Sequence, residues 1–192
     1  MTREEVSILI PENTNLFIEH ETALAFYDFM SKLPEEGRLV EIGTGIGDST
    51  RFFAKVKPKW HIYTIDGYGL FGEKSIYPYD PVDGRRTVAG EDLRRNVGSF
   101  EGFNIIQILQ NSTKVPWELP VDVIFIDGDH TYEGCRADFE RYSPFLKESG
   151  YIFFHDYYRD VFGVKQCVDE ICEKGWKLLY VDKAAIVEKK ND

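Results

Sequence analysis

The stretch "RLVEIGTGIGDST", residues 38–50, joins an apolar run to a glycine-rich turn and then to the start of a helical pattern. Gly43, Gly45 and Gly47 alternate with other residues, a spacing that suits a tight turn and lets the backbone approach a ligand closely. Asp48 or Ser49 can cap the helix that follows. The stretch therefore predicts a strand, a turn and a helix in succession, the opening unit of a parallel sheet.

Apolar runs of strand length recur along the chain, at 61–66, 103–109, 121–127, 150–156, 176–182 and 184–190. Helical patterns with one apolar face lie between most of them, and two of these patterns stop near Pro34 and Pro144. Continuously apolar strands separated by helices are typical of a parallel sheet covered on both faces. The last two runs are too close for a crossover and predict an antiparallel hairpin. We therefore expect a doubly wound, Rossmann-like α/β fold with a mostly parallel sheet.

Length and charge limit the classes of protein and of partner. The 192 residues, of which 43% are hydrophobic, suit a single domain spanning 1–192. A net charge of -10 would repel nucleic acid and anionic membranes, so we expect a neutral or cationic small-molecule partner. Three cysteines without a paired motif, and no signal-peptide or membrane-span pattern, favour a cytoplasmic protein with free thiols. These features leave homo-oligomerisation open.

The glycine turn by itself is a weak signal for a cofactor. A dinucleotide-binding GxGxxG pattern would require glycine where Asp48 stands, and a pyrophosphate at this helix start would meet Asp48 and Glu41. The same carboxylates would favour a cofactor that carries an ammonium and a sulfonium. Asp66 follows the turn by about 20 residues, the spacing at which an acidic side chain can bind both hydroxyls of a ribose.

Three stretches together carry a family resemblance: "VEIGTGIGDST", "YTIDG" and "VIFIDGDHTYEGCRADFERYSPFLKESGYIFFHDY". The chain, from about residue 16 onward, resembles class I S-adenosylmethionine-dependent methyltransferases. Within these it is similar to small-molecule O-methyltransferases of the macrocin type and, more distantly, to catechol O-methyltransferase. The resemblance implies a seven-stranded sheet in the order 3-2-1-4-5-7-6.

The resemblance also implies roles for individual residues. Glu41 would hold the methionine amino group through the turn, Gly43 and Gly45 would admit the cofactor, and Asp66 would hold its ribose. Ser112 would border the adenine, and Asp48, Ser49 and Asp127 complete the expected cofactor-binding set. The pattern departs from the family between Asp66 and Glu91, where residues 68–90 match no familiar motif and suggest a lid over the cleft.

Charged residues follow the fourth and fifth predicted strands. Asp127 and Asp156 would lie side by side at the carboxyl edge of the sheet, with His130 and His155 nearby. Converging carboxylates repel one another unless a cation offsets their charge. We therefore expect a divalent cation, Mg²⁺ in the first place and Mn²⁺ or Ca²⁺ as alternatives, on Asp127, Asp156 and His155. Carboxylates at the positions of Asp127 and Asp156 bind such an ion in related metal-dependent methyltransferases.

The predicted activity is transfer of a methyl group to a small hydroxylated molecule, such as a sugar or a secondary metabolite. His130 would act as the general base, and Asp127 would share the catalytic role. Two alternatives stay open: a redox-metal enzyme that uses His130, His155 and a carboxylate, or a cofactor-binding module without turnover. In a purely structural interpretation, Asp129, Thr131 and Glu133 only cap the next helix, and both histidines are ordinary turn or core residues.

Overall fold

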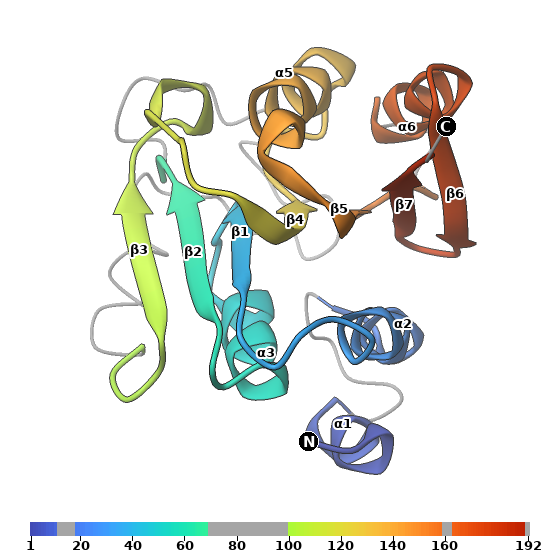
Figure 1. Cartoon of the computed structure of the whole chain (residues 1–192). Helices are drawn as coiled ribbons and strands as arrows, with labels where there is room; N and C mark the ends of the chain where they lie inside the picture. Colours follow the sequence, from blue (N-terminus) through green and yellow to red (C-terminus); the bar gives the residue numbers. More distant parts are fainter. Residues whose placement is uncertain (11–17, 69–99, 159–162, 191–192) are drawn as a thin grey trace, which may run out of the picture.

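Seven strands form one sheet in the order β3-β2-β1-β4-β5-β7-β6 in the computed structural model, which describes residues 1–10, 18–68, 100–158 and 163–190 (Figure 1). The strands are β1 (Arg38–Ile42), β2 (His61–Asp66), β3 (Ile105–Leu109), β4 (Val121–Ile126), β5 (Leu146–Phe154), β6 (Trp176–Val181) and β7 (Ala185–Lys189). The first five are parallel, and β7 runs antiparallel between β5 and β6. The predicted strand order and C-terminal hairpin are therefore confirmed.

Helices cover both faces of this sheet (Figure 1). On one face lie α1 (Arg3–Leu9), α2 (His20–Met30) and α3 (Asp48–Val56), and on the other lie α5 (Tyr132–Tyr142) and α6 (Val164–Glu173). Short 3-10 turns, η1 (Ser112–Lys114) and η2 (Ser143–Phe145), precede β4 and β5. None of the described helices is both long and apolar enough to span a membrane.

Side chains of the central strands alternate between two apolar cores, as the period of a strand requires. Val123 and Phe125 of β4 pack towards α2 and α3, whereas Ile124 and Ile126 pack towards α5 and α6. Phe26 of α2 stacks on Phe153 of β5, with ring centroids 4.5 Å apart. Burial of both strand faces explains why the runs are continuously apolar rather than alternating.

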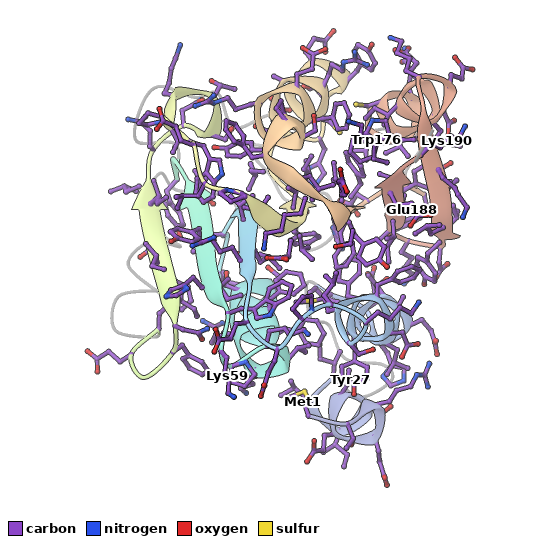
Figure 2. All side chains as sticks on the ribbon, viewed as in Figure 1. Met1, Tyr27, Lys59, Trp176, Glu188 and Lys190 are labelled. Atoms are coloured by element: carbon purple, nitrogen blue, oxygen red, sulfur yellow. The ribbon has the colours of Figure 1, made fainter. Side chains whose placement is uncertain are left out.

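The N-terminal helix is attached to the neighbouring helix α2. Thr2 and Glu5 form a capping box at the start of α1, and Arg3 lies 3.3 Å from Asp28. The Tyr27 hydroxyl donates to the Met1 carbonyl at 2.9 Å, and Figure 2 shows the two residues together between α1 and α2. These polar contacts hold α1 beside α2, and the buried Val6 of α1 joins the apolar core on this face.

Strand β5 begins well before its predicted position. β5 begins at Leu146 rather than at residue 150, because Leu146 pairs with Val121 before the register shifts. The polar segment after Leu146 hid this first part of the strand, and Lys147 there donates to the buried carboxylate of Asp122 at 2.9 Å. The predicted lid, 68–90, lies outside the described residues except for Tyr68.

Candidate active site

The glycine turn after β1 lies directly against the end of β4. Gly43 has a φ of 92°, and a Cβ atom on it would lie 2.1 Å from the carbonyl oxygen of Asp127. Only glycine fits this position, because both the backbone angle and the space exclude a side chain. The turn predicted to admit a cofactor therefore adjoins the first residue after β4.

Asp66 fastens the turn from the neighbouring strand β2. Its Oδ2 accepts from the backbone N–H groups of Thr44 at 2.9 Å and Gly45 at 3.0 Å. Its Oδ1 accepts from the N–H of Tyr68 at 2.6 Å. The residue expected to hold a ribose thus lies at the predicted strand end and organises the turn beside it. Tyr68, the first residue of the predicted lid, has a left-handed φ of 51° and accepts a hydrogen bond from Gln107.

Glu41 is fully buried behind the same turn. Its carboxylate accepts from the hydroxyls of Thr50 at 2.5 Å and Thr64 at 2.6 Å, and also from that of Ser49. Burial raises the pKa of Glu41 to about 7, although the three hydroxyls act in the opposite direction. The side chain expected to face a methionine amino group is thus enclosed by protein hydroxyls.

The expectation that Asp48 or Ser49 caps α3 is wrong. Gly47, with a left-handed φ of 80°, occupies the N-cap position, and no side chain caps this helix. Asp48 instead pairs with Arg51 at 2.7 Å, while Ser49 donates to Glu41. Because Gly47 is the N-cap, Asp48 and Ser49 are the first two residues inside α3 and do not occupy the position from which a side chain caps the helix.

Glu41→Gln is expected to flatten the pH dependence of stability. Because the pKa of Glu41 is raised from 4.5 to about 7 by folding, its contribution to the unfolding free energy is fully present below pH 4.5 and is lost as the pH rises to about 7. The loss is on the order of 3 kcal/mol in the wild type. Urea unfolding at pH 4.5 and pH 7 measures it. The exposed Glu21→Gln serves as control and should follow the wild type; an equally steep pH dependence in Glu41→Gln would contradict the assignment.

Ser112 links the loop after β3 to helix α5. Its hydroxyl donates to Asp138 at 2.5 Å, and its carbonyl accepts from the Tyr142 hydroxyl at 2.8 Å. Burial raises the pKa of Asp138 to about 6. The residue expected to border an adenine is therefore fixed by α5 at the carboxyl edge of the sheet.

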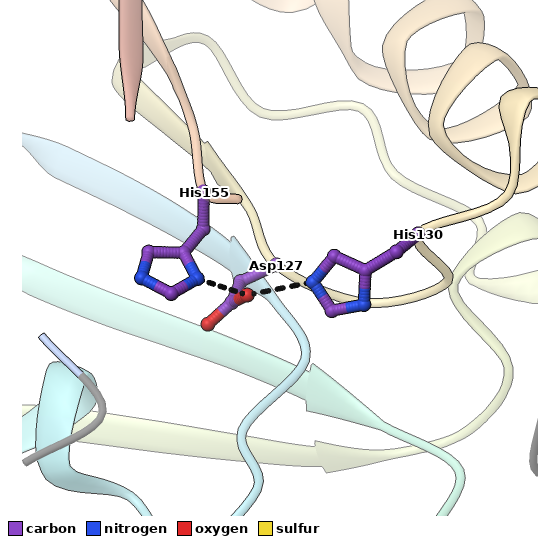
Figure 3. Close-up of side chains that lie close together, drawn as sticks. All are labelled: Asp127, His130 and His155. Carbon is purple, nitrogen blue, oxygen red and sulfur yellow. Dashed lines mark hydrogen bonds and ion pairs between the residues drawn. The ribbon is translucent and has the colours of Figure 1, made fainter. Parts of the chain in front are cut away.

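Asp127, His130 and His155 converge on one point beyond the ends of β4 and β5 (Figure 3). His130 Nε2 and His155 Nδ1 each lie 3.1 Å from the same oxygen, Oδ1 of Asp127. Three potential ligand atoms from these residues lie within 4.8 Å of one another. The chain thus brings two imidazoles and a carboxylate together at the predicted edge of the sheet.

Asp156 completes this centre from the end of β5. Its Oδ2 lies 3.4 Å from His130 Nε2, and its Oδ1 lies 3.6 Å from His155 Nδ1. Its backbone has a φ of 55°, a left-handed conformation that is unfavourable for a residue with a side chain. Such strain is typical of functional sites, where the surroundings impose the geometry. All four predicted residues therefore lie together, with His130 among the candidate ligands rather than only beside them.

The charges of the centre depend on one another. Burial opposes ionisation of Asp127, yet His155 and His130 lower the pKa of this carboxyl far below its usual range. Burial likewise opposes protonation of His155, but Asp127, Glu19 and Asp156 raise its pKa well above 6.5. The carboxylates therefore favour a cation at this position. Two imidazole nitrogens and two carboxylates are also a donor set that suits a divalent metal ion.

Thr131 has the capping role that the alternative interpretation gave it, whereas Asp129 supports Thr131 rather than capping the helix itself. Asp129 Oδ1 accepts from the N–H of Thr131 at 2.8 Å and from its hydroxyl at 2.7 Å. Thr131 is the N-cap of α5 and accepts from the N–H of Gly134. These contacts hold the turn that carries His130.

Glu19 was not predicted as a site residue. Its Oε2 lies 3.6 Å from His155 Nε2, although it precedes β1 by a whole helix. Neither a motif nor a strand end marked it, so only the folded chain reveals this contact.

Comparison with known proteins identifies the family and the fold of the chain. Residues 40–157 match a family model described as a methyltransferase domain. An uncharacterised protein, R132, of Acanthamoeba polyphaga mimivirus is 30% identical over 121 residues, which are 62% of this chain but only 50% of that relative. The O-methyltransferase NovP has a similar fold, with a TM-score of 0.66 at 18% identity over 93% of this chain and 84% of its own. The mycinamycin-pathway methyltransferase MycE, whose structure was solved with Mg, SAH and mycinamycin VI, also has a similar fold. Its TM-score is 0.61 at 17% identity, and the match covers 98% of this chain and 54% of the MycE chain.

Proposed function

The chain belongs to the methyltransferase-domain family of class I S-adenosylmethionine-dependent methyltransferases, and we propose that it methylates a hydroxyl oxygen of a small molecule with the help of a divalent cation. A sugar or a secondary metabolite is the acceptor class that we favour. The structures of NovP, named an O-methyltransferase, and of MycE, which holds Mg and SAH, support this choice.

One observation carries the proposal: the cofactor turn and the Asp–His centre lie in direct contact. Gly43 is so close to the Asp127 carbonyl that no side chain would fit between them. A methyl donor lying on the turn would therefore have its reactive end beside Asp127, His130 and Asp156. Transfer of a methyl group requires this kind of proximity between donor and acceptor.

The residues of the centre suit proton removal from an alcohol. Asp127, Asp156 and His155 would hold the cation, which supplies Lewis-acid stabilisation to the acceptor oxygen as its proton leaves. His130 Nε2 would accept that proton, and the carboxylates 3.1 Å and 3.4 Å away would stabilise the resulting imidazolium. S-adenosylmethionine, when bound, would supply the methyl group, its bond from carbon to the sulfonium sulfur breaking as the new C–O bond forms.

The cofactor assignments remain proposals of the same kind. Glu41 would act on the methionine amino group through the hydroxyl-lined turn, Asp66 on the ribose and Ser112 near the adenine. The negative net charge supports a small molecule rather than nucleic acid as partner. The three free cysteines support a reducing compartment such as the cytoplasm.

The decisive experiment combines binding and turnover. Calorimetric titration is expected to show binding of SAH and none of NAD, because the carboxylate of Asp48 begins the helix on which a pyrophosphate would rest. A screen of hydroxylated acceptors with labelled S-adenosylmethionine should then find methylated products. EDTA treatment should stop turnover and spare SAH binding. Full activity of the metal-stripped protein on its best acceptor would refute the role of the cation.

A second function deserves a test because Asp127, His130 and His155 form a two-histidine, one-carboxylate group. Such groups hold redox metals in other enzymes. Metal analysis of the protein as purified separates the two functions. Bound iron together with oxygen-dependent turnover would favour the redox enzyme, whereas methyl transfer supported by Mg²⁺ or Mn²⁺ would favour the methyltransferase.

A further inference from the structure

Glu19 occupies the N-cap position of α2 without capping the helix. Ser, Thr, Asp and Asn are the preferred residues there, because their short side chains accept from the first N–H groups of the helix. The Glu19 side chain makes no such bond. The start of the helix therefore does not explain this residue.

The side chain instead extends to the far nitrogen of His155. Glu19 Oε2 lies 3.6 Å from His155 Nε2, while the near nitrogen, Nδ1, lies 3.1 Å from Asp127 Oδ1. Figure 3 shows Nδ1 directed at Asp127 and the second ring nitrogen pointing away from it. Both Glu19 Oε2 and His155 Nε2 are buried, and neither has a hydrogen-bond partner within the described part of the chain, so each is the other's nearest complement.

Lys183 fixes the opposite oxygen of the same carboxylate. Its Nζ lies 3.4 Å from Glu19 Oε1, and it comes from the turn between β6 and β7. The ammonium therefore engages Oε1 and leaves Oε2 for the imidazole. Because Glu19 meets the ring on the side opposite Asp127, it is placed to orient His155 rather than to join the ligand atoms.

We infer that Glu19 is a positioning residue that accepts the Nε2–H of His155 and so turns the Nδ1 lone pair towards the divalent cation. The inference rests on the proposed function, which supplies the cation. A histidine that ligates through one nitrogen is generally oriented by an acceptor on the other, and loss of that acceptor lowers metal affinity by ~10–100-fold.

The test measures metal binding on the whole protein, stripped by EDTA dialysis and titrated with Mn²⁺ while free Mn²⁺ is followed by electron paramagnetic resonance. Glu19→Leu is expected to weaken Mn²⁺ binding ~10–100-fold, since it removes the acceptor. Glu19→Gln keeps an acceptor oxygen and should recover most of the affinity. Glu21→Gln, in the first turn of the same helix and exposed, is the matched control and should bind as the wild type does.

A spectroscopic readout separates positioning from a general loss of structure. Electron spin-echo measurements on bound Mn²⁺ should show the imidazole nitrogen coupling of His155 in the wild type and in Glu19→Gln, and a weakened or altered coupling in Glu19→Leu. Wild-type affinity in Glu19→Leu would overturn the inference while the cation site stands. Equal losses in the Leu and Gln variants would overturn the acceptor role. Absence of Mn²⁺ binding to the wild type would instead remove the cation, and with it the proposed function.

Discussion

Asp127→Asn is expected to reduce Mn²⁺ affinity by more than about 100-fold and to abolish metal-dependent methyl transfer. One oxygen of Asp127 lies 3.1 Å from both histidines, so the side chain is the common point of the centre. Loss of a residue that only hydrogen-bonds to a metal ligand lowers metal affinity by ~10–100-fold, and loss of the central carboxylate should have a larger effect. Mn²⁺ titration and a methyl-transfer assay measure the two quantities.

Asp129→Asn is the matched control for this change. It makes the same Asp-to-Asn change two residues after Asp127. Asp129 is exposed, and its carboxylate accepts a hydrogen bond from Thr131. It should bind Mn²⁺ as the wild type does. If Asp127→Asn kept wild-type affinity for Mn²⁺, the cation would have to be held elsewhere.

His130→Ala is expected to lower turnover by about 10² to 10⁴ while SAH still binds, because it removes the proposed proton acceptor. Its Nε2 lies between Asp127 and Asp156, which would stabilise the protonated ring. Turnover under saturating cofactor and calorimetric titration with SAH measure the two quantities.

His61→Ala is the control for general effects of losing an imidazole. His61 is exposed at the amino-terminal end of β2, away from the carboxyl edge of the sheet. That control should retain its rate. A normal rate in His130→Ala would show that this histidine is only a turn residue and not the base. Loss of Mn²⁺ binding along with turnover would show that His130 is a ligand and that another group accepts the proton.

Much of the fold was predictable because its strands are buried on both faces. Burial on both faces made most of β4 and the end of β5 apolar, and the close spacing of β6 and β7 indicated a hairpin. Hydrophobicity did not supply the strand order, which came from the family resemblance. The start of β5 was missed because the three residues after Leu146 are polar and exposed, so no apolar run marks this part of the strand.

The candidate site was predictable only where a residue ends a strand. Asp127, His155 and Asp156 could be grouped because parallel strands share a carboxyl edge. Glu19 gave no such signal, since it reaches His155 only through the packing of α2 on the sheet. The roles of Glu41 and Asp66 were also incompletely predicted, because the sequence does not reveal that hydroxyls and turn amides engage their carboxylates.

The contact between Glu19 and Lys183 has a consequence for the order of folding. The two residues come from an element before β1 and from the last hairpin of the sheet, so their contact spans nearly all of the described sequence. Contacts between such distant positions form late, because the chain entropy of closing a long loop must be overcome first. During synthesis on the ribosome, β1 to β5 can pair before Lys183 has emerged. The carboxylate behind His155 is then fixed only after the hairpin has docked, so a nascent chain would pair its five parallel strands before the Asp–His centre is fully oriented.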